Sequence, residues 1–120
     1  MRGDVLLVDA EGIIDLEHLR AAGLRVYNAN DVGDAIGWLA EGAAPDVVVV
    51  SVPPECEAVD RIRRRADDAT SIIVVGRDDR GWDSARRSGA DSFLLATADV
   101  LYEIHRALIL RRSGRRLPWM

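Results

Sequence analysis

The segment that most constrains the fold is a run of apolar residues between prolines at positions 45–54, with the sequence Pro-Asp-Val-Val-Val-Val-Ser-Val-Pro-Pro. Consecutive valines without polar alternation predict a strand buried on both faces, which is typical of the middle of a parallel sheet. Pro45 marks its start and Pro53 with Pro54 its end, because proline cannot donate to a sheet ladder. Open α/β sheets place their chemistry at the carboxyl ends of strands. The residue at that end here is Ser51.

Composition narrows the class of protein. A chain of 120 residues is long enough for one domain with its own core. The single cysteine, Cys56, cannot form an intrachain disulfide or a cysteine metal cluster, which fits a reducing cytoplasm. The apolar run at 5–8 is too short for a signal peptide or a membrane span, and a net charge of −4 favours neither nucleic acid nor anionic membrane. Lysine is absent, so Schiff-base chemistry is excluded. We expect a cytoplasmic protein with no membrane partner and no cofactor.

Apolar segments and helical patterns alternate along the chain. The expected strands are 5–8, 24–29, 45–52, 72–75 and 92–95, each followed by apolar residues at helical spacing. Asn30 or Asp31 is suited to cap the second helix and Asp99 the last, while Asp9 is interpreted as a cap at the entry to the first. Five strands alternating with five helices predict a parallel sheet with helices on both faces, joined by right-handed crossovers.

Several segments together resemble a bacterial response-regulator receiver domain (CheY-like). They are Val-Leu-Leu-Val-Asp at 5–9, the helix entry at 29–36, the strand at 45–50 and Gly-Ala-Asp-Ser-Phe-Leu at 89–94. The resemblance implies a flavodoxin-like, doubly wound α/β fold with a five-stranded parallel sheet in the order 2-1-3-4-5 and five helices. We therefore expect a receiver-like domain over residues 1–112 and a flexible C-terminal tail over 113–120. In this family Phe93 would occupy the aromatic position that switches.

The chemistry that this resemblance implies is mostly missing. Receivers hold magnesium with two acids after the first strand, phosphorylate an aspartate after the third, and bind the phosphoryl group with a Ser or Thr and a lysine. Asp9 keeps the first acid, but the other four positions carry Ala10, Ser51, Gly76 and Ala96. A neutral serine with no base near it in sequence is a weak nucleophile. We therefore expect no catalytic residue, no enzymatic activity and no metal, with Asp9 and Glu11 as the weaker magnesium alternative.

The last helix carries apolar residues outside its inward face. Val100, Leu101, Ile104, Ala107 and Leu108 account for the inward face, whereas Tyr102, His105 and Ile109 share another. In receivers the surface of helix 4, strand 5 and helix 5 serves output and dimerisation, so the resemblance adds Trp82 and Phe93 to this surface. The sequence thus predicts a phosphorylation-independent pseudo-receiver that acts in bacterial signal transduction through protein–protein contacts, with a homodimer as one form. Scattered surface apolar residues are the competing interpretation.

Two other functions stay open. Small residues at positions 51, 76 and 96 could leave room for a small molecule or anion at the carboxyl ends of strands 1 and 3, which is the alternative function. Arginines at 111, 112, 115 and 116 could contact a polyanion, but nucleic acid is the weaker option and would show strong salt dependence. The arginine run at 61–65 is flanked by aspartates and is interpreted as a solvated helix face.

Overall fold

The computed structural model describes residues 1–51 and 56–119, without the side chains of residues 56 and 57. The Pro53-Pro54 strand end and the Cys56 thiol therefore lie outside the described residues. In chain order the elements are β1 Asp4–Val8, α1 Leu16–Ala21, β2 Arg25–Ala29, α2 Val32–Ala40, β3 Val47–Ser51, α3 Cys56–Arg65, β4 Ser71–Gly76, the 3-10 helix η1 Asp79–Gly81, α4 Trp82–Arg87, β5 Ser92–Leu95 and α5 Val100–Arg111.

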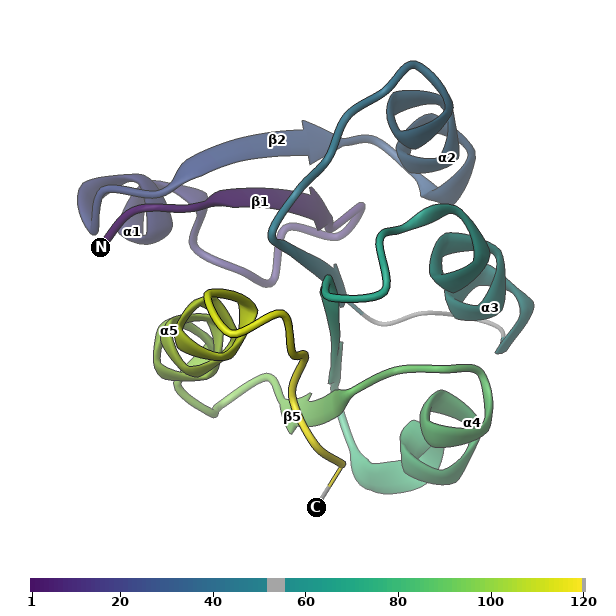
Figure 1. Cartoon of the computed structure of the whole chain (residues 1–120). Coiled ribbons are helices and arrows are strands. Elements are labelled where there is room, and N and C mark those ends of the chain that lie inside the picture. The colour runs from purple at the N-terminus through teal and green to yellow at the C-terminus, as the bar shows by residue number, and fades with distance from the viewer. Residues whose placement is uncertain (52–55, 120) are drawn as a thin grey trace.

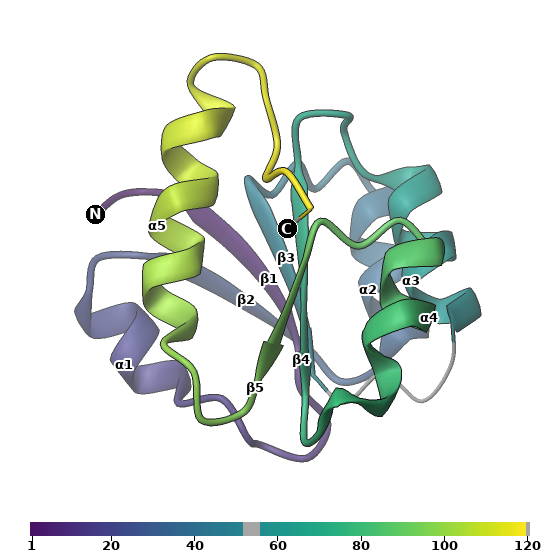
Figure 2. The same ribbon diagram turned by 90° about the horizontal axis from the view of Figure 1, so that it is seen from below.

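The five strands form one parallel sheet in the order β2-β1-β3-β4-β5, which confirms the predicted topology. Helices α1 and α5 cover one face, and α2, α3 and α4 cover the other (Figures 1 and 2). Strand β3 lies in the middle and is buried at all five positions, as its run of valines predicts. It begins at Val47, two residues after Pro45, and its carboxyl end places Ser51 beside the end of β1.

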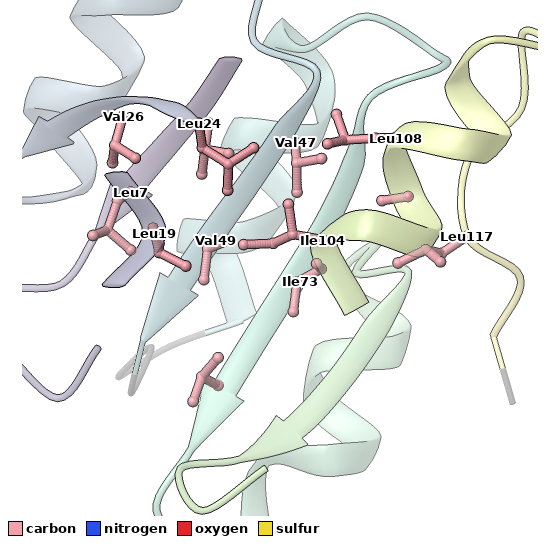
Figure 3. Packing of buried hydrophobic residues seen from close by; sticks show 13 residues of the cluster. Leu7, Leu19, Leu24, Val26, Val47, Val49, Ile73, Ile104, Leu108 and Leu117 are labelled. Carbon is pink, nitrogen blue, oxygen red and sulfur yellow. The ribbon is translucent and has the colours of Figure 1, made fainter. Parts of the chain in front are cut away.

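Two hydrophobic clusters, one on each face of the sheet, make up the core. Because side chains alternate along a strand, Val47 and Val49 pack on the α1/α5 side, whereas Val48 and Val50 pack on the α2–α4 side. Figure 3 shows the first cluster, where Ile104 and Leu108 of α5 lie over the sheet. Complete burial of a valine or leucine side chain stabilises the fold by about 1.5–3 kcal/mol, so the central valines account for much of the stability of the sheet.

The helix caps test the local sequence signals. Asp31 accepts a hydrogen bond from the amide of Asp34 and Asp99 from that of Tyr102, so both predicted caps are confirmed. The interpretation of Asp9 as the cap of the first helix is wrong. Helix α1 begins only at Leu16, and its cap is Asp15. The segment between β1 and α1 is a loop long enough to separate the strand-end acid from the helix.

One arginine of the run at 61–65 is not solvated, contrary to the interpretation from charge pattern. The Arg63 side chain is only 13% exposed and its Nη1 lies 3.0 Å from Oδ2 of Asp91, just before β5. Arg61, Arg64 and Arg65 do face solvent. Helix α3 therefore uses Arg63 to reach the start of the edge strand.

The tail contacts the domain through Arg116, Leu117 and Trp119. Leu117 is 3% exposed and joins the cluster on the α1/α5 side, next to α5 (Figure 3). Trp119 packs against the cluster on the other side. The boundary at residue 112 and the flexibility of the tail stay predictions, but the described part of the tail rests on the domain. None of the described helices is long and apolar enough to span a bilayer.

Candidate functional site

Asp9, directly after β1, and Ser51, at the end of β3, lie in contact. Strands β1 and β3 are parallel neighbours, so their carboxyl ends bring Asp9 and Ser51 together. Ser51 Oγ lies 2.5 Å from Oδ1 of Asp9 and 3.3 Å from the carbonyl oxygen of Val8. The hydroxyl is buried and donates to the carboxylate. The Asp9 carboxylate is thus placed to receive the Ser51 proton, a contact that the sequence does not reveal.

The Asp9 carboxylate also organises the loop that follows it. Its Oδ1 accepts from the amide of Ile13 at 3.1 Å and its Oδ2 from the amide of Ile14 at 2.8 Å. Together with Ser51, these donors occupy both carboxylate oxygens. The Asp9 carboxylate therefore anchors the β1–α1 loop.

The neighbouring acid points to a different partner. Ala10 stands exposed at the position of the second acid, and Glu11 forms an ion pair with Arg77, which follows β4. Both side chains of that pair are more than half exposed, so its net contribution to stability is small. Within residues 1–51 and 58–119 no three His, Cys, Asp or Glu side chains gather as a metal site. Magnesium binding by Asp9 and Glu11 stays a prediction.

Gly76, at the end of β4, lies against the ring of Phe93. A Cβ atom built on Gly76 would lie 2.6 Å from Cζ of Phe93 and 3.1 Å from the carbonyl oxygen of Asp78. The Phe93 ring therefore occupies the space that a serine or threonine side chain would need. Phe93 is partly buried and packs on the α2–α4 side of the sheet.

Ala96 lies beyond β5, where the resemblance implies a lysine. Its amide donates to the carbonyl oxygen of Gly76 at 2.9 Å, which ties the two strand ends together. Ala96 also lines a cavity of about 260 Å³ between the α1 and α5 regions, bordered by Asp15, His18 and Asp99. Its apolar lining consists of Ile13, Ile14, Leu19, Val75, Ala98, Val100 and Leu101. This cavity lies on the α1/α5 side, and ligand binding at the ends of β1 and β3 stays a prediction.

The predicted interaction residues fall on two sides of the edge strand. Tyr102 and Ile109 are 63% and 48% exposed on α5, with His105 exposed on the same helix. Trp82, which is 40% exposed, and Phe93 belong to the α4 side of β5. The structure therefore groups the three α5 residues and separates them from the two aromatic residues.

The sequence did not predict a buried ion-pair network just before β5. Asp91 is nearly buried; its Oδ2 accepts from Nη1 of Arg63 and from the amide of Ile72, and its Oδ1 lies 2.9 Å from Nε of Arg116. Burial raises the pKa of the Asp91 carboxyl, against the opposing effects of the Ile72 amide and the two guanidinium groups. Burial also lowers the pKa of Arg63. An aspartate directly before an expected strand was the available signal.

The comparisons agree on one fold. No protein-family model matches the chain, and no curated protein matches it significantly. Among solved structures, a CheY-like receiver domain protein from Methanospirillum hungatei is 16% identical with a TM-score of 0.78, over 95% of this chain and 99% of that one. A LuxR family DNA-binding response regulator from Silicibacter pomeroyi is 24% identical with a TM-score of 0.75, over 93% of both chains.

A response regulator from Thermotoga maritima is 22% identical, also with a TM-score of 0.75, over 91% of this chain and 99% of that one. At these identities the similarity establishes fold, and it coincides with the observed strand order. The structural neighbours of this chain are response-regulator receiver domains, and the chain has their CheY-like fold.

Proposed function

We propose that this chain is a phosphorylation-independent receiver domain that acts in signal transduction by binding a protein partner. The observation that carries the proposal is the contact between Asp9 and Ser51, in which the remaining acid accepts a hydrogen bond from the residue at the phosphoacceptor position. In that arrangement the acid is held by three protein donors and acts as a structural group.

Phosphoryl transfer depends on groups that balance the charge of the transferred phosphoryl. At the positions where receivers carry a Ser or Thr and a lysine, this chain has Gly76 and Ala96, which offer neither a side-chain donor nor a charge. Asp9 could accept the Ser51 proton, but a serine attacking a phosphoryl donor would gain no side-chain stabilisation from those two positions. The domain is therefore better suited to binding than to phosphotransfer.

The partner surface that we propose is the α4–β5–α5 face. Tyr102 and Ile109 project from α5 into solvent, and Leu95 at the end of β5 is 44% exposed. Exposed apolar groups gathered on neighbouring elements are typical of a protein-binding surface. A second copy of the chain is one candidate partner for this face.

Amide NMR spectra recorded with and without magnesium and beryllofluoride, which mimics an acyl phosphate, test the loss of phosphorylation. We expect no change around Asp9, Ser51 or Gly76. The variant Ser51→Asp, which restores the acceptor carboxylate, is the matched comparison in the same spectra. Saturable shifts in the parent chain that extend to Phe93 would contradict the proposal.

Light scattering at high protein concentration tests the homodimer. We expect a mass above that of the monomer, and we expect Tyr102→Ala with Ile109→Ala to return it to the monomer. Arg61→Ala, on the solvated face of α3, is the control that should leave the mass unchanged. A monomer at every concentration would contradict self-association.

A further inference from the structure

The tail meets the domain through specific contacts at the start of the edge strand. Nε of Arg116 lies 2.9 Å from Oδ1 of the buried Asp91, and the amide of Leu117 donates to Oγ of Ser71 at 2.9 Å. The Leu117 side chain enters the core beside α5. In Figures 1 and 2 the tail leaves α5 and crosses the sheet edge near β5.

Trp119 provides a second anchor, on α4. Its ring lies 5.3 Å from that of Trp82 in an edge-to-face arrangement at 62°, and the Arg86 guanidinium carbon lies 5.9 Å from its centroid. Both geometries are attractive contacts of aromatic rings. Among the described residues, the buried Nε1 of Trp119 has no hydrogen-bond acceptor. The Trp119 ring thus makes favourable contacts, but its buried N–H lacks an acceptor among the described residues, which reduces the stability of the docked ring.

The contacts define what this surface recognises. Its components are Ser71, Trp82, Arg86 and Asp91, which we call the tail-docking surface. Buried Asp91 selects a guanidinium, Ser71 accepts a backbone amide of an extended segment, and the Trp82 ring with Arg86 selects an aromatic ring three residues after the arginine. Complementary charge and aromatic anchors are the features that dominate recognition of a segment by a protein surface.

We propose that the tail-docking surface binds an extended segment of a partner protein with the pattern Arg-Leu-Pro-Trp, and that residues 116–119 occupy it in cis as a competitor. This inference rests on the proposed function, because it assigns the α4–β5 part of the partner face and the chemistry of the partner. The tail then sets a threshold, since a partner binds only by displacing Arg116 and Trp119.

A labelled peptide with the tail sequence Ser-Gly-Arg-Arg-Leu-Pro-Trp tests this by fluorescence anisotropy. It is titrated with the intact chain and with the double variant Arg116→Ala/Leu117→Ala, which removes the two side chains that hold the tail at Asp91 and in the core beside Ser71. A short tether gives the tail an effective concentration of about 1 mM. We therefore expect saturable binding to the double variant and about ten-fold weaker binding to the intact chain.

Two controls locate the binding. A peptide with alanine in place of its last arginine and its tryptophan should not bind, and Trp82→Ala in the double variant should weaken binding of the original peptide. If the double variant does not fold, Arg116→Ala/Trp119→Ala replaces it; Leu117 then stays in the core, and the peptide is expected to bind through Asp91 and Trp82. The proposal is overturned if the peptide does not bind the variant saturably, or if it binds the variant and the intact chain with equal affinity. Those results leave the beryllofluoride experiment untouched, so the two proposals fail separately.

Discussion

Because Gly76 lies against the Phe93 ring, we expect Gly76→Ala to destabilise the parent protein and to stabilise the Phe93→Ala variant. The Gly76→Ala variant places a methyl group 2.6 Å from Cζ and 3.1 Å from Cε2 of the Phe93 ring. Carbon atoms in contact lie about 3.5–4.0 Å apart, so the ring must move by about 1 Å. The carbonyl oxygen of Asp78, 3.1 Å from the new methyl group, limits movement of the strand in the other direction.

The expected magnitudes follow from these contacts. Overpacking of this kind costs about 1–3 kcal/mol of unfolding free energy. In a Phe93→Ala background the ring is gone, and replacing glycine by alanine inside a strand then stabilises by about 0.5–1 kcal/mol. The coupling free energy between the two positions is therefore about 1.5–4 kcal/mol, the sum of the two effects.

Urea unfolding of the parent, both single variants and the double variant measures this coupling. An unchanged slope of unfolding free energy against urea concentration would show that all four proteins expose the same surface on unfolding. Gly37→Ala is the matched control, because a Cβ there meets nothing within 4 Å and lies in helix α2, so it should stabilise by about 1 kcal/mol in both backgrounds. If Gly76→Ala costs the same free energy with and without the Phe93 ring, the steric argument is refuted.

Three further predictions concern the site and the tail. Ser51→Asp sets a second carboxylate against Asp9 and should lower the unfolding free energy in urea by about 2–3 kcal/mol; an unfolding free energy equal to that of the parent would contradict this. Arg116→Ala removes a guanidinium that lowers the pKa of Asp91, so carboxyl NMR titration should show that pKa rising further. A raised pKa means that folded Asp91 keeps its proton to a higher pH than unfolded Asp91, so the unfolding free energy falls as pH rises through this range. Arg116→Ala should therefore lose more unfolding free energy than the parent between pH 4 and pH 7. Trp119→Ala should cost about 1–2 kcal/mol in thermal or urea unfolding, whereas Trp119→Phe, which keeps the ring contacts and removes the unpaired N–H, should stay within about 1 kcal/mol of the parent; equal losses would mean that the indole N–H is engaged.

Local signals predicted most of the fold. The valines of β3 specify a strand buried on both faces, because positions 47–50 carry no polar side chain on either face. Asp31 and Asp99 cap their helices because each acts within three residues of itself. The sheet order came from the family resemblance, since alternation of strands and helices alone admits more than one parallel order.

Contacts between distant residues were not predictable in the same way. Arg63 looked solvated because aspartates flank the arginine run at 61–65, but its partner Asp91 is 28 positions away. Asp9 looked like a helix cap because the sequence does not show how long the loop before α1 is. That loop is shaped by the hydrogen bonds that the amides of Ile13 and Ile14 donate to the Asp9 carboxylate. Sequence spacing shows neither feature, since each requires the strands to be placed first.

The edge strand links the altered site to the tail. Phe93 turns toward the α2–α4 side, where Gly76 leaves space for its ring, and Trp119 packs against the same cluster. A side chain at position 76 would displace Phe93 and disturb the cluster on which Trp119 rests. Gly76 and the docked Trp119 thus support the same packing of β5.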